Sequence, residues 1–389
     1  MSDSDERAMR KDRVVAAVKQ EHKPDRVPLV SNAFTWKICD EEGVTFTQAH
    51  NDYSVMERVV VNHHKKYGFD GYFDYGVINA VKFANTLGKG SYVINDEAST
   101  MNFSEKAVMS EYDYKLIAEK GFATYIFEDY MPKKYHFTST EDAYDKIIRA
   151  TAECAAYYDY YYHISGVMNE EYHVPDLVPM WYYCAFEYFP WTLRGLKGIG
   201  IDMRRRPDEV EAAVKAVDEF VAPTFYEYVD GVVDSEDHIF SHSILMMANT
   251  ILSTKQFERY YWPILKKYID TTVEKGQLGF IYSEASLTRL FDFFQDIPKG
   301  SFGVLAELDP IQELQKKLPN VAICGGLSSE LLGHGTVKEC TDEAQRLLDT
   351  AAVNGNFIFG QKKMLSFPYD AKGENLKAVN DYVKEHGVY

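Results

Sequence analysis

Several features that mark large classes of protein are missing from this sequence. It has no uncharged apolar run approaching the roughly 18 residues needed to cross a bilayer, so we expect no membrane span. Its first residues, MSDSDERAMRKDR, are charged and lack the apolar stretch of a secretory signal. The five cysteines are odd in number and form no CxxC pair, which argues against a disulfide framework or a zinc finger. A reducing, cytoplasmic location fits this cysteine usage better.

A surplus of basic residues is also absent. The chain has 42 Lys and Arg against 59 Asp and Glu, a formal net charge of −17. Such a charge repels phosphate backbones, and we therefore expect no nucleic-acid partner.

Aromatic residues, in contrast, are abundant. The 29 tyrosines and 23 phenylalanines gather most densely in the segments AAYYDYYYHISG and MWYYCAFEYFPW. Two interpretations stay open: amphipathic packing with the tyrosine hydroxyls reaching water, or the wall of an aromatic pocket or partner surface.

Eight β-like runs follow one another along the chain, and most are separated by helical stretches. They lie near 26–34, 69–76, 177–186, 238–245, 278–286, 302–309, 320–326 and 356–361. Strands that alternate with helices in this way predict an α/β fold, a (β/α)8 TIM barrel whose chemistry lies at the carboxyl ends of the strands. We expect one domain over 1–389.

The predicted helices have clear start signals. One begins at Pro207 with an acidic first turn, a second runs from Ser253 to about Lys275, and a third runs from Thr336 to the Asn354-Gly355 stop. A long insertion, about 77–176, separates the second strand from the third and contains a small β excursion before a helix-rich stretch. Such an insertion on a barrel usually covers the active-site face or forms a subunit interface, as in a homodimer.

Four segments carry a family resemblance. They are PDRVP at 24–28, FPWTLRG at 189–195, FERYYWPILKKYID at 257–270 and GGLSSELLGHGTVKECTDEAQRLLD at 325–349. In this order and spacing, the chain resembles the uroporphyrinogen decarboxylase superfamily outside the insertion.

That family has two branches. True uroporphyrinogen decarboxylases carry an arginine-rich stretch after the first strand, where the resemblance places SNAFTWKICDEEG, with one lysine, no arginine and three acidic residues. The propionates of a porphyrinogen need bidentate basic partners, so porphyrinogen decarboxylation is not expected. The resemblance therefore implies the other branch, the corrinoid-dependent methyltransferases, whose members often bind one zinc at strand ends.

Zinc ligands are expected among His, Cys, Asp and Glu at strand ends. Cys324 is placed at the end of the seventh predicted strand, Glu284 at the end of the fifth, and His242 at the end of the fourth. In coenzyme M-type members a His-x-Cys pair ends the fifth strand, and Tyr282 and Glu284 stand in those places here. A spacing similar to that of some ether-cleaving members makes Asp296 an alternative ligand. Each of these residues also has a simpler interpretation, as a buried thiol, a bonded core histidine or a helix cap.

The remaining candidates surround the expected mouth of the barrel. Glu284 and Asp309 are the expected catalytic carboxylates, with Asp309 at the end of the sixth strand. Substrate-lining positions are predicted at Asn32, Tyr75, Trp181, Tyr183 and Glu187.

The leading hypothesis is zinc-assisted methyl transfer from a small methoxylated, aromatic compound to a Co(I) corrinoid (cobalamin) carried by a partner protein. Zinc would act as a Lewis acid on the ether oxygen. Three alternatives stay open: transfer from a methylcorrinoid to coenzyme M or tetrahydrofolate, decarboxylation of another substrate, and a non-catalytic ligand-binding barrel.

Overall fold

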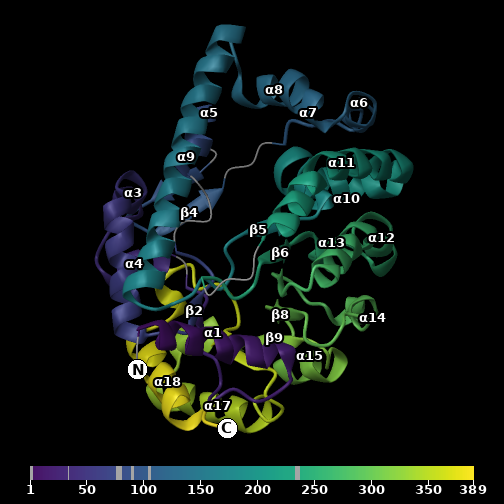
Figure 1. Ribbon diagram of the computed structural model, residues 1–389. Coiled ribbons are helices and arrows are strands. Elements are labelled where there is room, and N and C mark those ends of the chain that lie inside the picture. The colour runs from purple at the N-terminus through teal and green to yellow at the C-terminus, as the bar shows by residue number, and fades with distance from the viewer. Residues whose placement is uncertain (1–2, 34, 76–80, 89–91, 104–106, 233–236) are drawn as a thin grey trace.

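The computed structural model describes residues 3–33, 35–75, 81–88, 92–103, 107–232 and 237–389 (Figure 1). Within them, no helix is long and apolar enough to cross a membrane.

Parallel strands form the centre of the described molecule. Six belong to one sheet in the order β10-β9-β8-β7-β6-β5, and every neighbouring pair is parallel. Their bounds are β5 Trp181–Tyr183, β6 His242–Met246, β7 Gly279–Ser283, β8 Phe302–Ala306, β9 Ala322–Leu327 and β10 Phe357–Gln361. The α/β fold with a parallel sheet is therefore confirmed.

Two short strands continue this array. β1 (Val30–Ser31) pairs in parallel with β2 (Gly71–Tyr72). Parallel bridges from Leu29 to Phe359 and from Ala33 to Leu365 attach the β1 segment to the β10 side. In space the strands thus follow their order in the sequence, which is the order of a (β/α)8 barrel.

The β2 and β5 segments face each other across the remaining seam. A Cβ added to Gly71 would lie 3.3 Å from a methyl group of Leu177, just before β5, and 3.4 Å from one of Ile239. Side-chain packing therefore brings these segments together.

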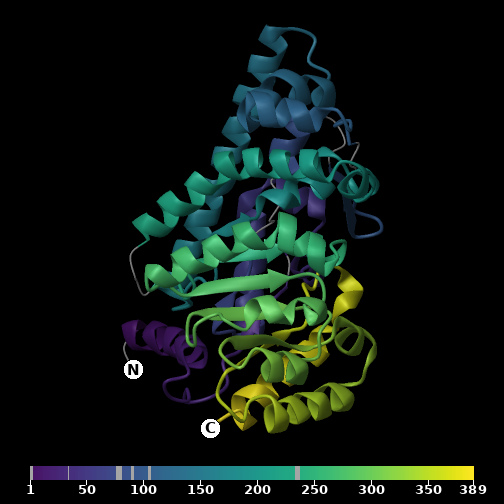
Figure 2. The ribbon, with the colours of Figure 1, turned by 90° about the vertical axis from the view of Figure 1, so that its right-hand side faces the viewer.

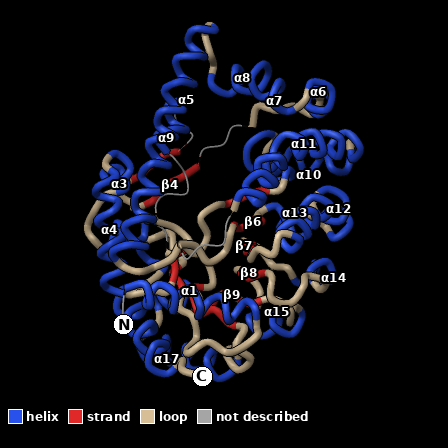
Figure 3. Tube along the Cα trace, in the orientation of Figure 1, coloured by secondary structure: helices blue, strands red, loops and turns tan. Residues whose placement is uncertain are grey.

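Helices surround the strands, as Figures 1 and 3 show. Outside the stretch between β2 and β5 they are α1 (Asp3–Lys19), α2 (Thr35–Glu41), α3 (Phe46–Asn51), α4 (Tyr53–Tyr67), α10 (Leu196–Arg205), α11 (Pro207–Gly231), α12 (Thr254–Tyr260), α13 (Trp262–Glu274), α14 (Phe291–Phe294), α15 (Ile311–Lys317), α16 (Ser329–His334), α17 (Val337–Thr350) and α18 (Gly373–His386). Capping boxes begin α12 at Ser253 and α17 at Thr336, as the sequence predicted. The single helix expected from Ser253 to Lys275 is divided at Tyr261, because Pro263 has no N–H to continue the first helix.

One hydrophobic cluster fills the space inside the strands. It includes or contacts a side chain from each parallel strand or the residue beside it: Val30, Phe73, Trp181, Leu245, Tyr282, Leu305, Cys324 and Ile358. Val14, Ala17 and Val18 of α1 join it, so α1 covers the amino ends of the strands. The opposite, carboxyl ends are where side chains can meet a ligand.

The stretch between β2 and β5 stands apart from this centre. It contains α5 (Val81–Leu87), an antiparallel hairpin of β3 (Tyr92–Asn95) and β4 (Thr100–Phe103), α6 (Asp113–Lys120), α7 (Phe122–Tyr125), α8 (Met131–Tyr135) and α9 (Thr140–Glu171). The expected β excursion is this hairpin. The 32 residues of α9 span about 48 Å, and Figures 1 and 2 show the helix rising away from the strands.

Candidate active site

Two acidic side chains follow neighbouring strands at their carboxyl ends. Glu284 comes directly after β7 and Glu307 directly after β8. Side chains two residues apart in a strand share a face. Glu284 therefore follows Tyr282 and Glu307 follows Leu305, both of which point into the interior cluster.

A hydrogen-bond chain links three strands at this end. The side-chain amide of Asn32 donates to the Tyr282 hydroxyl at 2.9 Å, and that hydroxyl donates to Glu307 Oε1 at 2.9 Å. The backbone N–H of Asn32 donates in turn to Gln361 Oε1 at 2.6 Å. The chain fixes the phenol of Tyr282 between an amide and a carboxylate.

The two carboxyl groups differ in their surroundings. Solvent reaches Glu284, yet the protein around it and the charges of Glu307 and Glu187 raise its pKa to about 7. Burial also raises the pKa of Glu307, against the Tyr282 hydroxyl, the Met364 N–H and the positive charge of Lys363, which favour its anion. Near neutral pH the arrangement places a proton on Glu284 and negative charge on Glu307.

Aromatic rings stand beside this pair. The Trp181 ring of β5 lies 5.8 Å from that of Tyr282 and 6.3 Å from that of Phe73. Tyr183, two residues after Trp181, is close enough to Glu187 and Glu284 for their charges to add to burial in raising its pKa. The predicted positions Asn32, Trp181 and Tyr183 are thus gathered around Tyr282 and Glu284.

Cys324 does not end its strand. It is the third of six residues in β9, and its thiol lies in the hydrophobic interior, where burial raises its pKa. The sequence placed it at the rim, but Gly325, Gly326 and Leu327 continue the ladder with β10 beyond it.

His242 is at the wrong end for the predicted zinc site. It is the first residue of β6, and its ring lies against Phe225 of α11, 5.0 Å away, outside the strands. Its nitrogens lie 2.8 Å from Ser241 Oγ and 3.3 Å from Thr272 Oγ1, and burial lowers its pKa to about 3. Since His242 pairs with Gly279, about 16 Å of strand separates it from the level of Glu284.

Asp296 and Asp309 also differ from their predicted roles. Asp296 is exposed after α14, in the connection that returns to the amino end of β8. Asp309 is buried three residues beyond β8 and accepts bonds from Ser286 Oγ, the Leu287 N–H and Thr288 Oγ1. It holds the loop after β7 in place.

Glu187 and Tyr75, both predicted to line the mouth, are buried in contacts with protein. Glu187 lies in the short helix η2 (Ala185–Glu187) and accepts bonds from the N–H groups of Met247 and Ala248, from Tyr261 Oη and from Trp191 Nε1. Burial and the neighbouring Asp176 carboxylate raise the pKa of Tyr75. Glu187 therefore acts on the site through its charge on Glu284.

The predicted zinc ligands do not fit a common metal ion. Cys324 lies inside the strands and His242 outside them, at different levels from Glu284. Among the residues that the structure describes, no group of three or more His, Cys, Asp or Glu is placed to hold a metal.

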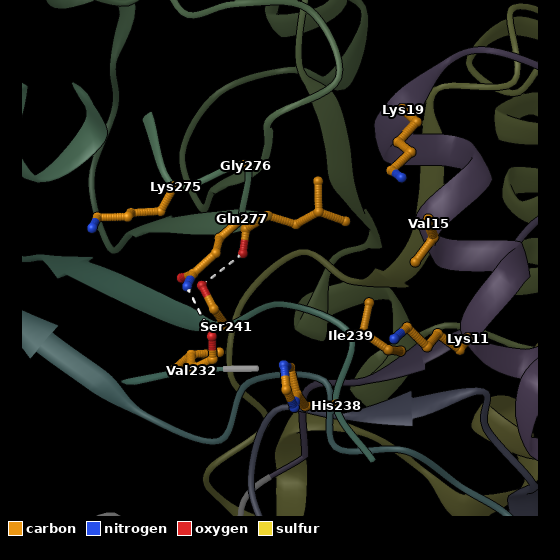
Figure 4. Close-up of a pocket in the computed structure, with 11 residues that line it drawn as sticks. Lys11, Val15, Lys19, Val232, His238, Ile239, Ser241, Lys275, Gly276 and Gln277 are labelled. Atoms are coloured by element: carbon orange, nitrogen blue, oxygen red, sulfur yellow. Dashed lines mark hydrogen bonds between the residues drawn. The ribbon is translucent and has the colours of Figure 1, made fainter. Parts of the chain in front are cut away.

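Figure 4 shows a cavity near the amino ends of the strands, beside α1. Its lining includes Lys11 and Lys19 of α1, His238, Lys275 and Gln277. Lys275 extends away from the others and pairs with Asp230 at 2.5 Å. The charges of this cavity are therefore only partly gathered toward one point.

Sequence reasoning missed Glu307 and passed over Tyr282. Both could have been found from the alternation along their strands, because Leu305 and Glu307, like Tyr282 and Glu284, occupy positions of one face. Asp309 was chosen instead of Glu307 because the run was extended past the true strand end at Ala306.

Comparisons with known proteins can now be set beside this geometry. Residues 193–386, just under half of the chain, match the family described as Uroporphyrinogen decarboxylase (URO-D). A solved structure, "methyltransferase from Methanosarcina mazei", aligns with a TM-score of 0.63 over 97% of this chain and 98% of that chain, at 14% sequence identity. No curated protein matches the sequence. The structural likeness is one of fold, and the matched family range contains both Glu284 and Glu307.

Proposed function

We propose that this chain is a single-domain (β/α)8 enzyme of the uroporphyrinogen decarboxylase family that demethylates a small methoxylated aromatic compound. The methyl acceptor would be a Co(I) corrinoid carried by a separate protein. The observation that carries the proposal is Glu284, a solvent-reached carboxyl group at the carboxyl end of β7 whose pKa is raised to about 7. The matched family and the methyltransferase fold are the context for this proposal.

The reaction needs an acid because an ether oxygen is a poor leaving group. The acceptor's electron pair forms the new bond to the methyl carbon, and the electrons of the carbon–oxygen bond move to the ring oxygen. Glu284 gives its proton to that oxygen, so that a phenol leaves and a carboxylate remains. Because solvent reaches Glu284, water can restore the proton for the next turnover.

Glu307 keeps the proton on Glu284. Its Oε1 accepts a bond from the Tyr282 hydroxyl, and Lys363 and the Met364 N–H also favour its charged form. Two adjacent carboxyl groups cannot both ionise easily, so the group with more donors takes the charge and the other remains protonated. Asn32 orients this pair through Tyr282.

The surroundings favour an aromatic methyl donor. The rings of Trp181, Phe73 and Tyr282 meet beside Glu284, and aromatic faces and edges pack well against a substrate ring. A flat apolar body with one ether oxygen therefore suits this site.

A porphyrinogen suits it poorly. Lys37, the single lysine in the stretch after β1, is buried and pairs with Glu41 at 3.1 Å. Its charge is already matched inside the protein, so it cannot serve substrate carboxylates as arginines would.

The expected zinc has no step in this mechanism, because the residues predicted to bind it do not converge. Protonation by Glu284 performs the task that a Lewis acid would otherwise have at the ether oxygen.

The test is spectroscopic. Enzyme is mixed with photochemically reduced cobalamin and a panel of methoxybenzenes, and the conversion of Co(I) to methyl-Co(III) is followed by absorbance. We expect transfer from at least one aryl methyl ether, with release of one phenol per methyl group. Loss of carbon dioxide from a carboxylated substrate, with no methyl transfer in either direction, would contradict the proposal.

A further inference from the structure

A second cavity, which we call the tyrosine pocket, lies between α9 and β5. Four tyrosines of α9 form one side of it: Tyr157, Tyr158, Tyr161 and Tyr162. Trp181 and Tyr183 of β5 and the preceding Pro179 and Met180 form the other side, around about 670 Å³ of open space. The tyrosine-rich segment of the sequence is therefore the wall of a pocket, one of the two interpretations left open above.

The tyrosine rings brace one another instead of filling the space. The Tyr157 ring lies 5.5 Å from that of Tyr158 at 67°, and 6.4 Å from that of Tyr161 at 45°. The Tyr158 and Tyr162 rings, both at least 46% exposed as residues, lie 6.4 Å apart. Ring faces of different orientation are thus held around one opening.

The charge of the lining has one sign. Asp74, which follows β2 and is 5% exposed, is the charged residue among those that line the pocket, and Lys, Arg and His are absent from this lining. Its carboxylate is close enough to Tyr157 that, after burial itself, it is the largest cause of that residue's raised pKa. Aromatic faces and a buried carboxylate together create a negative potential inside the pocket.

We propose that the tyrosine pocket binds a small organic cation of the methylated-ammonium class. A quaternary ammonium group has apolar methyl groups and a diffuse positive charge, and ring faces within about 6 Å attract it. A carboxylate at the base of such a cage adds ionic attraction without requiring an N–H donor on the ligand. An anion would meet repulsion from Asp74, and a neutral ligand would leave that charge buried without a counter-ion.

The pocket adjoins the candidate active site through two shared side chains. Trp181 lines the pocket and lies 5.8 Å from Tyr282, and Tyr183 lines the pocket beside Glu284. A bound ammonium group would therefore be held next to the acid, although its binding does not rest on the proposed methyl transfer.

Calorimetry with the full chain tests the proposal in the absence of any corrinoid. The probes are choline and its neutral isostere 3,3-dimethyl-1-butanol, which have the same shape but differ in charge. We expect choline to bind at least about fivefold more tightly than the isostere, which corresponds to the modest strength of cation–π and ionic contacts near solvent. Equal affinity for the two probes, or no heat from choline at millimolar concentration, would overturn it.

Variants locate the binding. Tyr158→Leu should weaken choline about three- to tenfold, whereas Tyr158→Phe, which keeps the ring face, should stay within about twofold. Tyr144→Leu is the matched control, because Tyr144 is exposed on the same helix and does not line the pocket. A loss with Tyr144→Leu equal to that with Tyr158→Leu would contradict the location.

A turnover experiment separates this inference from the proposed function. If choline binds and aryl ethers still donate their methyl groups to Co(I), both statements hold. If aryl ethers react and choline does not bind, the tyrosine pocket has another ligand. If choline binds and donates a methyl group while no aryl ether reacts, the inference stands and the proposed substrate class is wrong.

Discussion

The two ends of the parallel strands treat buried charge in opposite ways. At the amino end, Arg13 of α1 binds Asp25 at 2.7 Å and Asp70 at 3.0 Å, and Arg26 binds Asp70 at 2.7 Å. At the carboxyl end, Glu284 and Glu307 are acidic neighbours whose pKa values are both raised. Matched charges stabilise the fold, whereas unmatched ones store a proton that can be used. This division is the one expected of a barrel enzyme.

The largest effect should follow from removing the acid at the carboxyl end. Glu284→Gln keeps the shape of the side chain but cannot donate a proton, so we expect aryl-ether demethylation to fall about 10²- to 10⁴-fold. The rate of methyl-Co(III) formation measures this effect. The free energy of unfolding in urea should change by less than about 0.5 kcal/mol, because Glu284 is reached by solvent. A variant that retains full activity would remove Glu284 from the mechanism.

Asp70→Ala should have the opposite signature. The carboxylate is 1% exposed, holds two arginines and accepts the Leu29 N–H at 2.9 Å. Its removal leaves the buried Arg13 guanidinium with one partner fewer, so we expect a loss of about 3–5 kcal/mol in unfolding free energy. Chemical denaturation measures it, with Asp270→Ala, which breaks an exposed pair with Lys266, as a control expected to cost less than about 1 kcal/mol. Equal losses in the two variants would contradict this description of the amino end.

His242 and Cys324 sharpen the comparison, because the sequence assigned both to the functional end. His242→Gln should cost about 1–3 kcal/mol of stability by disturbing buried hydrogen bonds, and Cys324→Ser a similar amount by placing a hydroxyl in an apolar interior. The folded fraction of each variant should retain methyl transfer within about threefold. Elemental analysis of both variants beside the unaltered protein provides a second measurement. Loss of one bound zinc per chain in either variant would restore the original hypothesis.

The sequence predicted the strands well and the ends of the strands poorly. All eight β-like runs contain a strand of the structure, because β-rich runs between turn signals are a local property. Which residue ends a ladder depends on its neighbours: His238 forms only an isolated bridge with Asp176, so β6 begins four residues later than the predicted run and His242 becomes its first residue. Glu284 was found because it directly follows its strand. The contacts that join Asn32, Tyr282 and Glu307 link residues up to 275 positions apart and were beyond reach of the sequence.

The pH dependence of the reaction tests the charge assignment at the carboxyl end. Glu284 donates only while protonated, and its pKa is raised to about 7, so the protonated fraction falls as pH rises through 7. We expect the rate of demethylation to be level below about pH 6 and to fall nearly tenfold per pH unit above about pH 8. The measurement is kcat over pH 5.5–9 with a methoxybenzene that does not itself titrate. A rate that instead rises above pH 7 would require a base, not an acid, at this position.

The smallest effect should come from Tyr282→Phe, which removes one hydroxyl from the centre of the chain that joins Asn32 to Glu307. Without this donor Glu307 is a weaker anion, so more of the shared negative charge moves to Glu284 and the proton becomes easier to lose from that group. The pH at which the rate falls should therefore move down by about half a unit, and kcat at pH 7 should fall about threefold. Phenylalanine keeps the ring contacts with Trp181 and Phe73, so KM for an aryl ether should change little. The shift in the pH profile distinguishes this electrostatic role from simple packing, because a packing defect would lower kcat at every pH and leave the midpoint where it was.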